Sequence, residues 1–161
     1  MFARLLLMFS LLWAVAASAQ TAYSDPAGNY RLAVPAGWQV QPQGGGVSLL
    51  SGPAYASLII VSGRGSPKGL VEAMAQNFLG QWRSFQGAST GDTRFAGNNG
   101  AYSWFTGVNP KGVESVLKIV ATTDGEQGYA LIYSAPRSTF GSRKADLESV
   151  EASIELLHGR K

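Results

Sequence analysis

The chain has 161 residues, with 13 Lys and Arg, 10 Asp and Glu and a single histidine, for a net charge of +3. This balance is too even to indicate a nucleic acid or an anionic membrane as partner. The lack of cysteine in the sequence excludes disulfides, thiol nucleophiles, Cys-ligated zinc and iron–sulfur clusters.

The first residues predict export. Residues 1–19 contain one positive charge, Arg4, an apolar run and the small-x-small triplet Ala17-Ser18-Ala19. The apolar run is well short of the roughly 20 residues that span a bilayer. We therefore expect a cleaved signal peptide at residues 1–19, with the cut after Ala19, rather than a membrane anchor.

Residues 20–161 have a length that suits one domain. The expected first residue, Gln20, has no thiol to carry a lipid anchor, and no later apolar run is long enough to span a membrane. We therefore expect a periplasmic or extracellular protein.

Strand patterns come first in the mature chain. Residues 29–34 alternate apolar and polar, and Pro35 ends the run. Residues 47–50 predict a second strand, and residues 55–62 a third that is covered on both faces. Residues 41–46 are the loosest segment.

A helix is predicted next. Ser66 is a good N-cap, and Pro67 suits the first helical position. One apolar stripe repeats every four residues, with two flanking residues. Its members are Leu70, Met74, Phe78 and Trp82, flanked by Val71 and Phe85.

Two hairpins and a final helix complete the order. Asn99-Gly100 predicts the first turn. The second hairpin joins residues 113–122 to residues 129–134. A helix from about Ser138 is expected to bury the stripe Phe140, Leu147, Val150, Ile154 and Leu157. Antiparallel strands with separate helices predict an α+β fold.

The turn at residues 63–69 is the one candidate ligand site. It fails the dinucleotide fingerprint, because Lys68 occupies the position of the third glycine and Pro67 removes an N–H. Arg64 and Lys68 beside a helix N-terminus form a weak candidate anion site. A solvated turn without a ligand is the favoured alternative.

Acidic residues give no clear catalytic or metal motif. Glu148, Glu151 and Glu155 follow helical spacing, which is read as a metal stripe or, more commonly, as solvated charge with Lys144 pairing Glu148. His158 lies close to the C-terminus. We therefore predict no catalytic residue, no metal and no cofactor.

Aromatic residues allow two interpretations. Trp38 follows a Pro-Ala-Gly bend and is expected to plug the core rather than to grip a ligand. A core layer is likewise favoured over a ligand platform for a second group. That group is Tyr102, Trp104, Phe105, Tyr129 and Tyr133.

The run "DPAGNYRLAVPAGWQV" resembles the start of PsbP-like superfamily domains. The matching residues are Asp25, Gly28, Tyr30, Leu32, Pro35, Gly37 and Trp38. The closing run "GYALIYSAPRSTFGSRKADLESVEASIE" is similar too. The resemblance implies an α/β/α sandwich around a mainly antiparallel sheet with two principal helices. The superfamily includes photosystem-associated proteins, a nuclear transport factor and bacterial exported proteins, so no activity is implied.

The combined prediction is an exported, non-enzymatic accessory or binding module. Its expected partner is another envelope protein or a small ligand. The alternatives are a carboxylate-dependent hydrolase, or a structural or stress-related envelope protein.

Overall fold

The computed structural model describes residues 20–63 and 65–157. The signal peptide predicted at residues 1–19, Arg64 and His158 lie outside the described residues. The elements in chain order are β1 (Thr21–Ser24), β2 (Tyr30–Val34), β3 (Gln39–Gln43), β4 (Gly46–Ser51), β5 (Ala54–Ser62), α1 (Pro67–Leu79), β6 (Arg83–Phe95), β7 (Asn98–Val108), β8 (Glu114–Thr123), β9 (Gln127–Pro136), α2 (Phe140–Ser153) and β10 (Glu155–Leu156).

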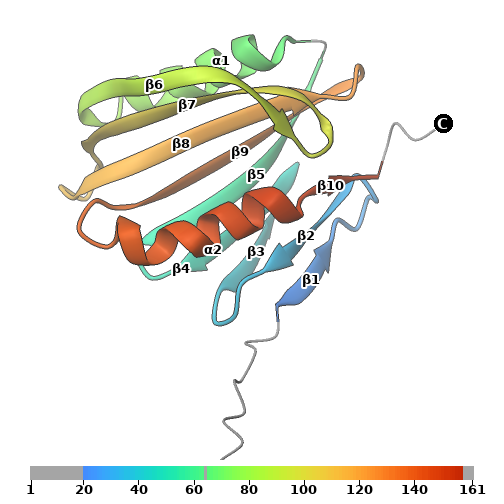
Figure 1. Cartoon of the computed structure of the whole chain (residues 1–161), viewed down its shortest axis with the longest axis horizontal. Helices are drawn as coiled ribbons and strands as arrows, with labels where there is room; N and C mark the ends of the chain where they lie inside the picture. The colour runs from blue at the N-terminus through green and yellow to red at the C-terminus, as the bar shows by residue number, and fades with distance from the viewer. Residues whose placement is uncertain (1–19, 64, 158–161) are drawn as a thin grey trace, which may run out of the picture.

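The elements form three layers (Figure 1). A seven-stranded antiparallel sheet of order β3-β4-β5-β9-β8-β7-β6 lies in the middle. Helix α1 packs on one face, mainly over β7 and β8. Helix α2 and the small sheet β1-β2-β10 lie on the other. The predicted α+β class and sandwich arrangement are confirmed.

Each face of the sheet has its own apolar core. Beneath α1, Leu70, Val71 and Ala75 pack against alternate residues of β8 and β9. On the α2 side, Leu147 and Val150 join buried residues of β2, β4, β5 and β9. Within the described residues, no helix is long and apolar enough to cross a membrane.

Helix α1 begins as predicted and ends earlier than its apolar stripe. The Ser66 hydroxyl accepts a hydrogen bond from the Gly69 N–H at 3.0 Å, and Pro67 is the first helical residue. The helix ends at Leu79, so Trp82 lies in the connection to β6 and Phe85 lies in that strand. The four-residue repeat therefore continues past the end of the helix.

The first hairpin turns earlier than expected. Its turn is Ala96-Gly97, where φ is 49° and 82°, and Asn99-Gly100 lies inside β7. Gly100 is needed there for a different reason, because a Cβ at this position would lie 2.7 Å from the Ala121 carbonyl oxygen. The prediction of a turn at Asn99-Gly100 was therefore wrong, because this glycine marks a close contact between strands.

Three further expectations need correction. The segment predicted as loosest contains part of β3, which pairs with β4 along its whole length. Glu155 lies in β10 rather than in the last helix, because the helix ends at Ser153. Leu157, predicted to be buried, is 41% exposed.

Candidate functional site

The predicted anion site is only partly described. Lys68 is exposed in the first turn of α1. The adjacent hollow, of about 360 Å³, is lined by Ser66 and Lys68 and also by Asp92 and Asn99. The carboxylate of Asp92 opposes binding of an anion in the same hollow. Weak anion binding by Arg64 and Lys68 stays a prediction.

Each of the three glutamates predicted as one stripe forms an ion pair with a different cationic side chain. Lys118 Nζ lies 2.7 Å from Glu151 Oε2. Lys144 Nζ lies 3.7 Å from Glu148 Oε1, which is the pairing that the spacing predicted. Glu155, on β10, pairs instead with Arg31 of β2.

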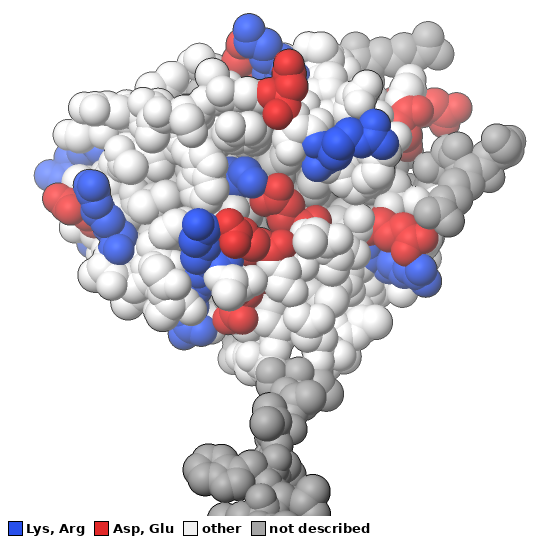
Figure 2. Space-filling view, in the orientation of Figure 1, with Lys and Arg blue, Asp and Glu red and all other residues white. Residues whose placement is uncertain are grey.

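Charges of both signs are interspersed on the α2 face of the molecule (Figure 2). Within the described residues, no group of three or more His, Asp or Glu side chains is placed to hold a metal ion. The charges on this face are arranged in pairs of opposite sign. A carboxylate that is paired with a lysine or arginine cation is not free to act as a general base.

Asp124 has a structural task in the β8–β9 turn. It accepts hydrogen bonds from the N–H groups of Gln127 and Glu126, at 2.8 and 2.9 Å, and from the Tyr129 hydroxyl at 3.0 Å. Burial opposes ionisation of this carboxyl, but the hydrogen bonds outweigh it and lower its pKa. Asp124 therefore stabilises the turn that the sequence predicted.

A partly buried ion pair was not predicted from the sequence. The side chains of Lys118 and Glu151 are only 13% and 17% exposed. The Lys118 ammonium also lies 5.4–5.7 Å from the ring centroids of Tyr102, Trp104 and Tyr133. Tyr102, Trp104 and Tyr133 thus belong to a core layer on the α2 side that is built partly around a cation, whereas Phe105 lies on the α1 side of the sheet.

The same layer keeps Tyr133 neutral. Burial, and then the charges of Glu151 and Glu148, raise the pKa of its phenol far above the ordinary value. A hollow of about 400 Å³ next to Lys118 and Glu151 is lined on its far side by Arg94. The pair ties α2 to β8, and nothing in the sequence spacing of Lys118 and Glu151 indicated that they meet.

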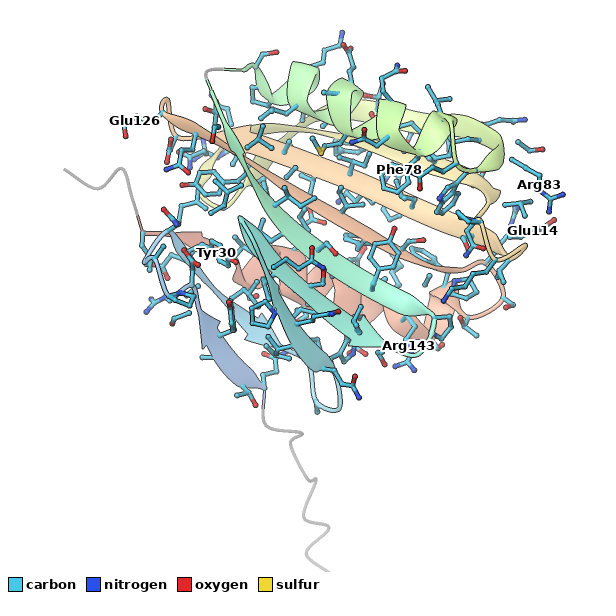
Figure 3. The ribbon with its side chains drawn as sticks, turned by 180° about the vertical axis from the view of Figure 1, so that it is seen from behind. Tyr30, Phe78, Arg83, Glu114, Glu126 and Arg143 are labelled. Carbon is cyan, nitrogen blue, oxygen red and sulfur yellow. The ribbon has the colours of Figure 1, made fainter. Side chains whose placement is uncertain are left out.

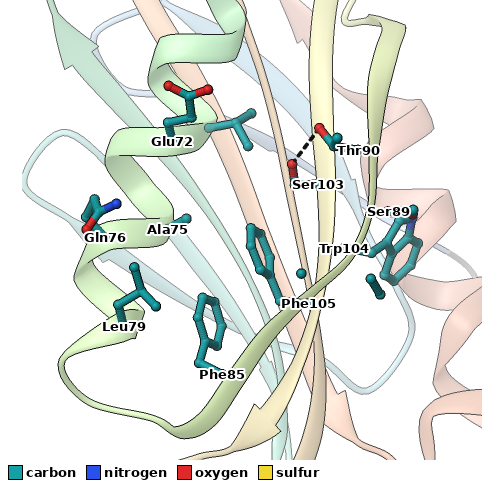
Figure 4. Close-up of a pocket in the computed structure, with 13 residues that line it drawn as sticks. Glu72, Ala75, Gln76, Leu79, Phe85, Ser89, Thr90, Ser103, Trp104 and Phe105 are labelled. Carbon is teal, nitrogen blue, oxygen red and sulfur yellow. Dashed lines mark hydrogen bonds between the residues drawn. The ribbon is translucent and has the colours of Figure 1, made fainter.

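A concave groove lies between α1 and strands β6 and β7 (Figure 4). Its volume is about 520 Å³. The Phe85 and Phe105 rings stack in its floor, with centroids 4.7 Å apart. Leu79 is 49% exposed at one end. Glu72 contributes the one charged side chain among the lining residues.

The groove exists because β6 extends beyond the helix. Helix α1 packs mainly over β7 and β8, so the edge strand β6 is little covered. The pairing of β6 with β7 shifts register between Gly87 and Ser89, where Ala88 is an extra residue. Such a bulge bends a strand and increases its twist. Thr90 accepts a hydrogen bond from Ser103 at 2.9 Å beside it.

The aromatic floor was partly visible in the sequence. Phe85 was singled out as a flank of the helical stripe, and Phe105 as one of the strand aromatics. Their stacking depends on the pairing of β6 with β7, in which Gly87 lies opposite Phe105. Because the turn of this hairpin was predicted three residues late, the sequence analysis could not bring them together.

The overall architecture was then compared with known proteins. No protein-family model and no curated protein matches the chain. The Ran-binding protein Mog1p of Saccharomyces cerevisiae is similar in structure, at 9% identity, over 87% of this chain and 96% of that chain, with a TM-score of 0.60. The cyanobacterial PsbP of Synechocystis matches at 15% identity, over 89% and 95% of the two chains, with a TM-score of 0.57.

The chain has the PsbP/Mog1 fold. A third structure of this fold is LpqN, described as involved in cell envelope biogenesis of Mycobacterium tuberculosis. It matches at 12% identity, over 86% of this chain and 91% of that chain, with a TM-score of 0.56. The predicted PsbP-like resemblance is thus confirmed at the level of the fold, and identities this low carry no site residues across.

Proposed function

We propose that the protein is an exported, non-enzymatic accessory module that binds a partner protein of the cell envelope through the groove between α1 and β6. The observation that carries the proposal is the open apolar groove with its stacked pair, Phe85 and Phe105. The export signal predicted at residues 1–19 supports this location, as does the fold shared with LpqN, which is described as involved in cell envelope biogenesis.

The groove fits an apolar segment of a partner. Val71 and Ala75 supply small side chains along the helix wall, so a ligand side chain can approach the aromatic floor closely. Burial of one large apolar side chain is worth about 1.5–3 kcal/mol. The floor is formed by two aromatic rings, and the nearby hydroxyls of Thr90 and Ser103 are hydrogen-bonded to each other, which favours binding over catalysis.

The ion pairs on the other face support a non-enzymatic role. Two of the acids on that face, Glu148 and Glu151, form ion pairs with Lys144 and Lys118. A carboxylate-dependent hydrolase needs an ionised base and an acid of raised pKa that converge on one substrate atom. The binding module is therefore preferred to the hydrolase.

The test uses two exposed leucines as matched positions. Leu79→Gln changes the groove, whereas Leu157→Gln changes a leucine that is similarly exposed, at 41%, outside it. A photo-crosslinking residue at Gln76, on the groove wall, is introduced into the full chain in cells. We expect a discrete crosslinked partner that Leu79→Gln removes and Leu157→Gln leaves intact.

Two results would contradict the proposal. One is a crosslinked species that persists at equal yield in Leu79→Gln. The other is recovery of the protein from the cytoplasmic fraction with its first residues intact, since an envelope partner would then be out of reach.

A further inference from the structure

Strands β3, β4 and β5 have one face that no helix covers. Helix α1 packs over the other half of the sheet, on β6 to β9, whereas α2 and β2 lie on the opposite side. Seen from behind, α1 covers the upper strands and the face of β3–β5 is turned to the viewer (Figure 3). Tyr55 and Ile59 mark this face, because both belong to the core cluster on the α1 side.

The strand register fixes which residues share this open face. Gln39, Leu50 and Tyr55 lie opposite one another in one row. The next row is formed by Gln41, Ser48 and Ser57. Neutral amides and hydroxyls therefore alternate with apolar and aromatic groups across three strands.

This face carries no formal charge. No Asp, Glu, Lys or Arg occurs in the sequence between Arg31 and Arg64. On the α2 face, by contrast, charges of both signs are interspersed (Figure 2). A charged ligand or an oppositely charged protein surface would find no complementary group on β3–β5.

Part of the polar set is ordered and part is free. Gln43 donates to Ser48 at 2.9 Å, and the Ser48 and Ser57 hydroxyls are 2.7 Å apart, which makes one chain across the three strands. Within the described part of the protein, the amides of Gln39 and Gln41 and the Tyr55 hydroxyl have no hydrogen-bond partner. These free groups offer both donors and acceptors to a ligand.

We infer that this open face of β3–β5 binds a neutral glycan chain. Sugar hydroxyls are uncharged donors and acceptors, which match side-chain amides and hydroxyls, and the apolar C–H face of a sugar ring packs on aromatic and aliphatic side chains. Gln39 and Gln41 supply the hydrogen bonds, and Tyr55 with Leu50 supplies the apolar contact. The open strands accept an extended chain without enclosing it. This site is separate from the α1–β6 groove.

A protein partner fits the same face less well. The cores of protein interfaces are rich in aromatic residues, Met and Arg, and Tyr55 is the one such residue in the open rows that include Gln39, Gln41 and Gln43. Packing a dry surface on three glutamines would remove water from their amides without replacing the hydrogen bonds. A glycan replaces them with its own hydroxyls.

The test uses the folded mature chain and three defined probes: maltohexaose, cellohexaose and N-acetylglucosamine hexamer. Binding is followed by amide chemical shifts in two-dimensional NMR. We expect millimolar binding of at least one probe, with shifts grouped on β3–β5, and at least tenfold weaker binding in Gln39→Ala/Gln41→Ala. The exposed pair Asn77→Ala/Gln81→Ala, which lies outside both the open face and the lining of the groove, is the matched control and should bind as the wild type does.

Each other outcome overturns the inference. These are no shift with any of the three probes, shifts grouped on the α1–β6 groove, or equal binding by both double variants. Sedimentation of the same samples adds one more: a dimer that Gln39→Ala/Gln41→Ala dissociates would assign the face to a second copy of the chain. The unfolding temperature of each variant shows that it is folded. The crosslinking experiment at Gln76 tests the α1–β6 groove alone, so its failure would not contradict glycan binding on β3–β5.

Discussion

At the scale of single residues, the structure shows how Trp38 is held in the core. Its ring is 7% exposed and belongs to the core cluster on the α2 side. The indole Nε1–H donates to Asp146 Oδ2 of α2 at 3.3 Å. The predicted plug is confirmed, and it also joins the β2–β3 connection to the last helix.

Replacing Trp38 should therefore be costly. We expect Trp38→Ala to lower the free energy of unfolding by about 3–5 kcal/mol, as truncation of a large buried aromatic does. Trp38→Phe keeps most of the buried ring and should lose less. Urea unfolding of both variants measures the difference, and equal stability of the wild type and Trp38→Ala would contradict a core role.

Tyr55 gives a pH dependence that can be predicted with its sign. Burial raises the pKa of this phenol from 10.0 to about 12. Its neutral form thus favours the folded state, a contribution that is complete below pH 10.0 and lost as the pH rises toward 12. The contribution is about 2–3 kcal/mol, at roughly 1.4 kcal/mol per pKa unit.

The measurement compares the wild type with Tyr55→Phe. The free energy of unfolding should fall less steeply in the variant as the pH rises through 10.0 and above. A parallel decline in both proteins would show that Tyr55 ionises in the folded state as readily as in the unfolded chain. Tyr30, Tyr129 and Tyr133, whose pKa values burial also raises, contribute the decline that remains.

At the scale of elements, the sequence predicted best those features in which neighbouring residues satisfy the hydrogen bonds of the backbone. Ser66 and Pro67 predicted the start of α1 because capping is a contact between near neighbours. Strand β3 was missed, since Gln39–Gln43 is exposed throughout and has no apolar alternation. This strand forms because it pairs with β4, and such pairing cannot be predicted from the spacing of apolar residues.

Gly100 distinguishes a turn glycine from a packing glycine. A Cβ at this position in β7 would lie 2.7 Å from a carbonyl oxygen of β8. We expect Gly100→Ala to destabilise the protein by about 1–3 kcal/mol through this overpacking. Gly141→Ala is the control, since its Cβ in α2 meets open space.

The control should be neutral or stabilising by up to about 1 kcal/mol, because alanine favours helix over glycine. Thermal unfolding of the two variants provides the comparison. If Gly100→Ala were tolerated as well as Gly141→Ala, β7 and β8 would have to be further apart than the structure places them.

At the scale of the whole molecule, the sequence predicted the layers but not the surfaces between them. Alternation and helical periodicity were sufficient for an α+β sandwich. The Lys118–Glu151 pair joins β8 to α2, and the Phe85–Phe105 stack depends on the β6–β7 pairing. The ion pair and the aromatic stack both depend on how whole elements pack together. Local sequence patterns therefore do not predict them.

Export is the prediction that concerns the complete chain. We expect a mature protein that begins at Gln20 and is recovered in the soluble envelope or extracellular fraction, because residues 1–19 have the pattern of a signal peptide. N-terminal sequencing of the recovered protein identifies the first residue. A chain that keeps Met1 and remains with the membrane would contradict the prediction.

The two edge strands of the central sheet have features that affect aggregation. Within the described residues the sheet ends at β3 and β6. Pro42 removes one N–H from β3, and β6 has two register shifts and the charged residues Arg83, Asp92 and Arg94. Proline, bulges and charge are the features by which edge strands resist edge-to-edge aggregation. A chain without cysteine has no disulfides to hold its fold, and such edges oppose aggregation while it folds.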